Sequence, residues 1–235
     1  MSAVYKREMR AYFTTFTGYV YVATFLVLSG AAFIYTTLSM GSDGDYTTYY
    51  SLIMMLFAVL VPLLTMKSFA DEKRLKTEAL LLTSPVSLFS VVFAKFLAAF
   101  TVFAATLAVS CVNLIPMYLY GAPNTAILLG NLFSVFLIGS AFVSIGIFMS
   151  SITENQLVAA ITAIATIVQF LAVGMFSSGI GFAPLRFILD FLSIFNRFTL
   201  FTYGYFDYSA LVYYCSVAAV FLFLTVRVYE SKRWS

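Results

Sequence analysis

The sequence contains no histidine, and this absence excludes several kinds of active site. Haem carriage through histidine, histidine-ligated zinc and intramembrane hydrolysis by Ser–His or Glu–His pairs all need an imidazole. The only cysteines, Cys111 and Cys215, lie inside apolar runs without CxxC spacing, so we expect no disulfide and no metal site. A GxxxxGK[ST] phosphate loop is also missing, so we expect no ATP hydrolysis by this chain alone and no catalytic residue.

Charge is scarce as well. Charged residues make up 10% of the chain, against about 25% in soluble domains, whereas 62% of the residues are hydrophobic. Several apolar runs reach the length of about 20 residues that a membrane-crossing helix needs. A soluble fold of 235 residues could not bury so much apolar surface. The composition therefore predicts an all-α polytopic membrane protein, with a single transmembrane domain over residues 1–235.

Six membrane spans are expected in this domain. They cover residues 18–40, 49–66, 89–119, 125–149, 157–176 and 208–228, with ends placed to within a few residues. Before the first span, residues 1–16 carry Lys6, Arg7 and Arg10 on one helical face, which predicts an interfacial helix lying on anionic lipids. The alternative is an ordinary basic flank of the first span.

The segment 177–207 is too interrupted by serine, glycine and proline to be one regular span, yet it is rich in phenylalanine and leucine. We expect a re-entrant or outer-leaflet pair of short helices there, with its loop backbone sheltered by protein. Arg186 and Asp190 are spaced to pair on one helical face. An amphipathic helix resting on the outer surface is the alternative.

The distribution of positive charge supports six spans. Of the 13 Lys and Arg residues, only Arg186 and Arg197 fall on one side of this layout. The positive-inside rule then places both termini in the cytoplasm. Lys95, near the start of the third span, is expected to extend its ammonium group to the cytoplasmic interface.

Residues 67–87 form a charged segment between the second and third spans. It holds Asp71, Glu72, Lys73, Arg74, Lys76 and Glu78. We expect an amphipathic helix from Asp71 to Leu82, with acidic residues at its start and a stop at Ser84-Pro85. An ordinary solvated loop that keeps the protein oriented is the alternative.

The letters FADEKRLKTEALLLTSPVS in this segment closely resemble the first cytoplasmic loop of type-2 ABC transporter permeases, most of all the small six-span permeases of the gliding-motility and copper-processing kind. The matching positions are Glu72, Arg74, Thr77, Glu78, Leu80, Leu81, Thr83, Ser84 and Pro85. Lys95 fits the lysine that opens the third span in that family, and Lys76 stands where the family often has glycine.

The resemblance implies that this loop is a coupling helix that docks on a separate ABC ATPase subunit. The implied contacts are Asp71, Glu72, Lys73, Arg74, Thr77 and Glu78, with Glu154 and Asn155 of the next loop as a lesser contact. ATP and Mg²⁺ would then be bound by the ATPase, and this chain would need no cofactor of its own. With a second permease copy or a related permease, the complex would export a substrate, or transmit mechanical force, across the cell membrane of a prokaryote. Membrane lipids and an extracytoplasmic protein are further candidate partners, and nucleic acid is not.

Two other functions stay open beside the transporter subunit: a membrane-anchoring or assembly subunit, and an ion-coupled carrier. The carrier is disfavoured because no ionisable residue lies in the middle of five of the six expected spans. Gln169 is the most polar residue deep in a span, which makes it a candidate for the substrate pathway or a dimer interface. An interhelical hydrogen bond is the alternative for this side chain.

Overall fold

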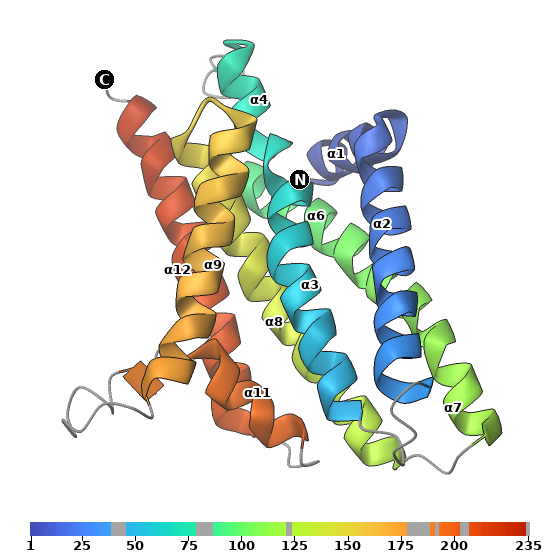
Figure 1. The fold of residues 1–235 in the computed structure, drawn as a ribbon. Coiled ribbons are helices and arrows are strands. Elements are labelled where there is room, and N and C mark those ends of the chain that lie inside the picture. Colours follow the sequence, from blue (N-terminus) through green and yellow to red (C-terminus); the bar gives the residue numbers. More distant parts are fainter. Residues whose placement is uncertain are drawn as a thin grey trace.

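The computed structural model describes residues 1–38, 46–78, 87–120, 124–177, 189–190, 193–202 and 207–233, and within them every regular element is a helix. Figure 1 shows a bundle of long helices with both termini near the same end. The elements are α1 Ser2–Thr14, α2 Phe16–Phe33 with a π-helical turn η1 Ile34–Leu38, α3 Tyr46–Thr65, α4 Lys67–Arg74, α6 Leu88–Ser110 with a 3₁₀ turn η2 Cys111–Leu114, α7 Ile115–Tyr120, α8 Thr125–Ile152, α9 Gln156–Ser177, α11 Ile194–Thr202 and α12 Tyr208–Arg233.

Six of these helical stretches are long and apolar enough to cross a membrane, which confirms the predicted six-span, all-α architecture. They are Phe16–Thr36, Thr47–Arg74, Leu88–Leu114, Thr125–Ile152, Gln156–Gly174 and Tyr208–Ser231. The predicted ends of the fourth, fifth and sixth spans agree with these to within three residues. The second stretch continues to Arg74, beyond the predicted end at 66. The third span, predicted to reach residue 119, ends its α-helix at Ser110, and η2 and α7 follow. The predicted end of the first span at residue 40 lies outside the described residues.

Helix α8 lies at the centre of the bundle and packs against α3, α4, α6, α9, α11 and α12. Two glycines on α8 make close packing feasible. A Cβ atom added at Gly139 would lie 2.0 Å from Cζ of Phe103 on α6, and one added at Gly146 would lie 2.1 Å from Oγ1 of Thr65 on α3. Small residues at helix contacts let neighbouring backbones approach closely in membrane proteins. The spacing of α3, α6 and α8 therefore depends on these two positions.

The predicted N-terminal helix is present as α1. Its end is set by Thr15, whose backbone is extended at φ −93° and ψ 150°, so that α2 starts afresh at Phe16. Figure 1 shows α1 lying across the end of the bundle at a steep angle to α2, as expected of an interfacial helix. Gly18 permits this turn, because a Cβ atom there would lie 2.6 Å from the backbone oxygen of Tyr12.

The predicted helix from Asp71 to Leu82 is wrong in its bounds. Helix α4 begins at Lys67 as a direct continuation of α3, since the single residue between them, Met66, is itself helical at φ −54° and ψ −32°. It ends at Arg74, and two residues further on Lys76 is left-handed, with φ 55°. There the amide of Thr77 donates to Glu72 O at 2.9 Å and the amide of Lys76 donates to Lys73 O at 3.0 Å.

These two hydrogen bonds form a Schellman motif, which ends a helix at a residue in the left-handed region. Glycine is the residue best suited to that position, and Lys76 occupies the place where the resembling permeases often have glycine. The motif thus stops the helix at the centre of the segment expected to be continuous. Residues 79–86, with the expected stop at Ser84-Pro85, lie outside the described part of the chain.

The segment predicted to hold a pair of short helices contributes α11, which packs against α8, α9 and α12 at the end of the bundle opposite α4 (Figure 1). The hydroxyl of Tyr214 donates to Ile194 O at 2.9 Å and anchors the start of α11. The expected Arg186–Asp190 pair falls partly outside the described residues, because 178–188 and 191–192 are among those not described. Asp190 accepts a hydrogen bond from the side-chain amide of Asn196 at 3.0 Å.

Candidate functional site

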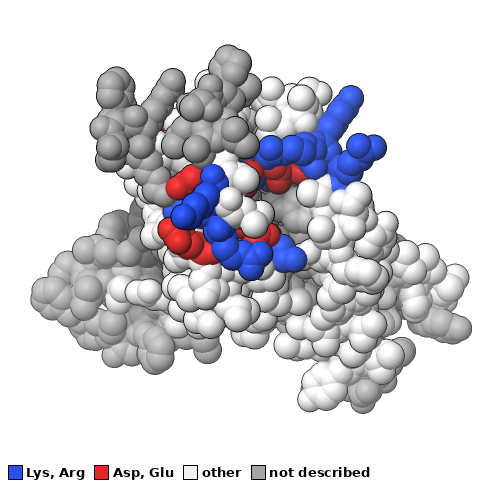
Figure 2. All heavy atoms as spheres, turned by 90° about the horizontal axis from the view of Figure 1, so that it is seen from above, with Lys and Arg blue, Asp and Glu red and all other residues white. Residues whose placement is uncertain are grey.

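Charged side chains gather at the end of the bundle formed by α1, α4, the loop between α8 and α9, and the last turns of α12. We call this the charged end. Figure 2 looks onto it and shows acidic and basic side chains intermixed rather than segregated by sign. The mixing indicates that many of these charges neutralise one another, so the position of each one decides whether it is available to a partner.

Lys95 of α6 is the central cation of this end, and its side chain is only 2% exposed. Its ammonium group donates to Glu8 Oε1 at 3.2 Å, to Glu72 Oε1 at 3.0 Å and to the backbone oxygen of Ser68 at 2.6 Å. It also lies 4.8 Å from the ring centroid of Phe69. Two carboxylates and a carbonyl therefore replace water around the Lys95 ammonium group. That this group reaches the cytoplasmic interface stays a prediction.

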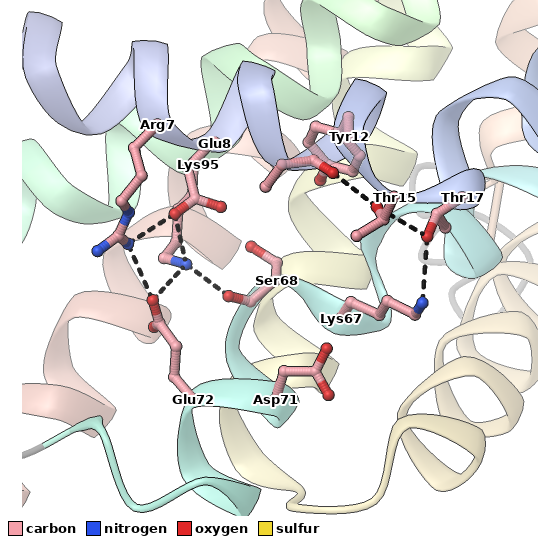
Figure 3. A pocket seen from close by; sticks show the side chains of 11 residues that line it. Arg7, Glu8, Tyr12, Thr15, Thr17, Lys67, Ser68, Asp71, Glu72 and Lys95 are labelled. Atoms are coloured by element: carbon pink, nitrogen blue, oxygen red, sulfur yellow. Dashed lines mark hydrogen bonds and ion pairs between the residues drawn. The ribbon is translucent and has the colours of Figure 1, made fainter.

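Arg7 of α1 completes this ion cluster. Its guanidinium group lies 2.7 Å from Glu8 Oε1 and 3.0 Å from Glu72 Oε1. The pKa of Arg7 is raised, mainly by its hydrogen bond to Glu8 and to a smaller extent by the charge and hydrogen bond of Glu72. Burial of the guanidinium group acts in the opposite direction. Glu72, predicted to touch a partner protein, is thus turned inward, where it joins α4 to α1 and α6 (Figure 3).

A second set of contacts joins α4 to the end of α8. The hydroxyl of Ser150 accepts from the amides of Phe69 at 2.9 Å and Ala70 at 3.1 Å, and it donates to Met66 O at 3.0 Å. The ammonium group of Lys73 donates to Ser151 O, and the Lys73 residue is only 6% exposed. The expectation that Lys73 is available to a partner is therefore wrong, because its charge caps the carbonyl end of α8.

Asp71 links α4 to the start of α9. Its Oδ1 atom accepts a hydrogen bond from the side-chain amide of Gln156 and lies 3.4 Å from Arg74. Together with the Lys73–Ser151 contact, this bond ties α4 to both sides of the short loop between α8 and α9. The two predicted contact loops, one after α3 and one between α8 and α9, are thus close in space. In the sequence they are separated by the third and fourth spans.

Other predicted contact residues point outward. The Arg74 side chain is 62% exposed and Leu75 is 64% exposed, while Lys76, Thr77 and Glu154 are exposed as well. Asn155 is also exposed, and its Oδ1 atom accepts from the amide of Leu157 at 2.9 Å, which caps α9. Glu78 is half-buried. We call Arg74, Leu75, Lys76, Thr77, Glu154 and Asn155 the exposed tip. Leu75 and Lys76 are the two members that the partner prediction did not include.

Gln169 lies on an exposed and mostly apolar side of α9, one turn after Ala165 and two turns after Thr162, with Ile161 and Val168 beside it. It forms no hydrogen bond to any residue in the described part of the chain, so the interhelical hydrogen bond considered from the sequence is not seen there. A polar amide on an open apolar face of a membrane span is costly unless another molecule covers it.

A pocket of about 310 Å³ opens beside the ion cluster, between α1, the start of α2, α4 and α6. Figure 3 shows Arg7, Glu8, Glu72 and Lys95 on one side of it and Thr17 and Lys67 on the other. Among the described residues no group of three or more Cys, Asp or Glu side chains is placed to hold a metal ion. The pocket is lined by polar and charged side chains from four helices.

The six spans and the charged end define a multi-pass membrane component with an exposed, charged tip at one end. A family model described as ABC-2 family transporter protein matches residues 14–232, and the chain belongs to this family. It is accordingly a permease subunit of an ABC transporter, and the family implies an ABC ATPase as its partner. No curated protein matches the chain. The narrower likeness to gliding-motility permeases stays a prediction.

Proposed function

We propose that this permease couples ATP hydrolysis in a separate ATPase subunit to export, and that the ATPase docks on the exposed tip. The observation that carries this proposal is the continuity of α3 with α4 through Met66. A force applied to the tip of a continuous helix moves the membrane span itself, because no flexible loop intervenes. The exposed apolar Leu75 between Arg74 and Lys76 suits a docking contact with a buried centre and a charged rim.

The contacts behind the exposed tip support the same function. Ser150 and the Lys73–Ser151 bond fasten α4 to α8, the Asp71–Gln156 bond fastens it to α9, and Glu72 fastens it to α1 and α6 through Lys95. Of the coupling residues implied by the family resemblance, Asp71, Glu72 and Lys73 therefore transmit motion, whereas Arg74, Thr77, Glu154 and Asn155 face the ATPase. This division suits rigid-body motion of packed helices.

The orientation follows from the same proposal. The positive-inside rule places the charged end in the cytoplasm, where ATP is hydrolysed, and both termini lie at that end (Figure 1). The membrane would be the cell membrane of a prokaryote, and α11 at the opposite end would be available to an extracytoplasmic protein.

Reversing charge on the exposed tip is expected to disrupt docking without unfolding the permease. In the double variant Arg74→Glu and Glu154→Lys, we expect ATPase binding to weaken about tenfold or more. Each reversed charge would then face a charge of the same sign on the ATPase surface. The permease and its ATPase are co-expressed, and their co-purification and ATP hydrolysis rate are measured.

Arg227→Glu is the matched control, because Arg227 is an exposed arginine of α12 at the same end and lies outside the exposed tip. It should co-purify with the ATPase as the native chain does. Full retention of the ATPase by the double variant, at unchanged thermal stability, would remove the exposed tip from the docking contact.

We also propose that a second permease copy covers the exposed face of α9 and shelters Gln169. A cysteine at Gln169 is expected to form a crosslink between two copies in native membranes, in a chain with Cys111→Ser and Cys215→Ser. Both natural cysteines are free thiols, and Cys215 is exposed, so their removal is needed for a clean readout. The crosslinked species is measured by its mass on denaturing gels.

Ala163→Cys is the control on the same helix, because Ala163 is buried inside the bundle and should give no crosslink. Equal crosslinking at the two positions, or a covalent product with a different permease chain in place of a second copy, would contradict this assignment of Gln169.

A further inference from the structure

The pocket beside the ion cluster carries charges of both signs in equal number. Its lining contains the three cations Arg7, Lys67 and Lys95 and the three anions Glu8, Asp71 and Glu72. Its volume of about 310 Å³ lies at the lower end of the range of about 300–1,000 Å³ typical of ligand sites. A pocket with this size and charge balance suits a small polar group that is itself zwitterionic.

Not all of these charges are neutralised within the protein. Lys95 and Arg7 are both bound to Glu8 and Glu72 through the Oε1 atoms of the two carboxylates. Lys67, in contrast, donates to the uncharged hydroxyl of Thr17 at 3.1 Å and has no carboxylate partner among the described residues. One ammonium group on the pocket wall is therefore left to attract an anion.

One carboxylate oxygen of the pocket lining is left without a donor. The contacts of Asp71 to Gln156 and Arg74 both use Oδ1, so its Oδ2 atom has none among the described residues. Glu72 Oε2 also has no hydrogen-bond partner within the described part of the chain, but it is buried and does not face the pocket. A ligand that supplies N–H groups can donate a charge-assisted hydrogen bond to Asp71 Oδ2.

The position of the pocket points to a lipid as the source of such a ligand. It lies where α1 turns into α2 and where α3 continues into α4 (Figure 3). Charged side chains replace apolar ones at this level, which is where the spans are expected to leave the apolar layer. Phe16 and Tyr19, at the start of α2, are 84% and 58% exposed. Aromatic side chains at this level are typical of the membrane interface, and they give acyl chains an apolar surface next to the pocket.

We propose that the pocket binds the head group of a phospholipid with a primary ammonium, of the phosphatidylethanolamine kind. The phosphate lies against Lys67, and the ammonium group donates to Oδ2 of Asp71. A head group with only negative charge satisfies Lys67 but gives Asp71 Oδ2 no donor. A trimethylammonium head group has no N–H to donate, so it is disfavoured as well.

Lipid selectivity of the native chain is the first test, and it needs no variant. The permease in detergent is titrated with phosphatidylethanolamine, phosphatidylcholine and phosphatidylglycerol of identical acyl chains, and binding is followed by native mass spectrometry. We expect phosphatidylethanolamine to bind about tenfold more tightly than the other two, as loss of one charge-assisted hydrogen bond implies. Equal binding of the three lipids, or tighter binding of phosphatidylglycerol, overturns the proposal.

Two pairs of variants then locate the site. Lys67→Gln and Asp71→Asn should each weaken phosphatidylethanolamine binding about tenfold. Lys76→Gln and Glu154→Gln, which remove the same charges from exposed positions outside the pocket, should leave it unchanged. Unchanged binding in the first pair, at native thermal stability, overturns the assignment of the pocket. Soluble phosphoethanolamine should compete only weakly with phosphatidylethanolamine for the pocket. If it competes as strongly as the lipid does, the ligand need not come from the membrane, and that part of the proposal is overturned.

Discussion

Replacing Lys95 with methionine is expected to lower the free energy of unfolding of the permease by about 3–5 kcal/mol, the cost of breaking a buried ion pair by removing one partner. Methionine fills much of the space of the lysine stem but leaves Glu8 and Glu72 without their common cation. The carbonyl of Ser68 also loses its donor. The loss is measured as a fall in the thermal unfolding temperature of the protein in detergent.

Two comparisons separate this effect from loss of side-chain packing. Arg227→Met breaks an exposed pair with Glu230, whose ions lie 2.9 Å apart, and should cost less than about 1 kcal/mol. Adding Glu8→Gln and Glu72→Gln to Lys95→Met should restore a large part of the lost stability, because neutral amides do not need a cation. A loss in Lys95→Met no larger than in Arg227→Met would mean that the ion cluster does not hold α1, α4 and α6 together.

Span positions could be predicted from the sequence because their signals are local. Apolar runs of sufficient length mark the spans, and polar residues mark their starts. Asn124 caps α8 by accepting a hydrogen bond from the amide of Ala126 at 3.0 Å, and the predicted start of that span at 125 agrees with the structure. The predicted end at 149 falls three residues short, because Ser150 and Ser151 continue the helix while bonding to α4.

Helix α4 shows why polarity alone misplaces a helix boundary. Hydropathy falls sharply after Met66, so the sequence predicts that the membrane helix ends there and that a separate helix begins further on. The backbone continues as a helix because its hydrogen bonds are local and do not depend on whether side chains face lipid or water. The left-handed residue that ends α4 is a lysine, which gives a much weaker sequence signal than glycine would.

Whether a given charged side chain faces inward or outward could not be predicted from the sequence. Glu8 and Lys95 are far apart along the chain, and only the fold brings them within 3.2 Å. For Lys73, however, helical periodicity does indicate a buried position. It lies one turn after Phe69, which is buried, so the two share the face of α4 that packs on α8. A motif that matches a family therefore contains both inward and outward residues, and periodicity helps to separate them.

Replacing Gly146 with leucine is expected to cost about 1–3 kcal/mol of stability or more, because it inserts a side chain where α8 touches α3. A Cβ atom alone would come within 2.1 Å of the Thr65 hydroxyl, which already donates to Val61 O at 3.1 Å in a fully buried site. The measurement is again thermal unfolding in detergent. Gly30→Leu is the matched control, because a Cβ atom at Gly30 meets nothing within 4 Å, and it should be close to neutral.

The same substitution also tests transmission through α4. Gly146 lies one helical turn before Ser150, whose hydroxyl accepts from the amides of Phe69 and Ala70. A wedge between α8 and α3 at Gly146 should therefore pull Ser150 away from α4 and lower ATP hydrolysis in the complex, although the exposed tip is untouched. Equal thermal stability of Gly146→Leu and Gly30→Leu would contradict the close packing. Reduced stability with unchanged ATP hydrolysis would instead contradict transmission along the α3–α4 helix.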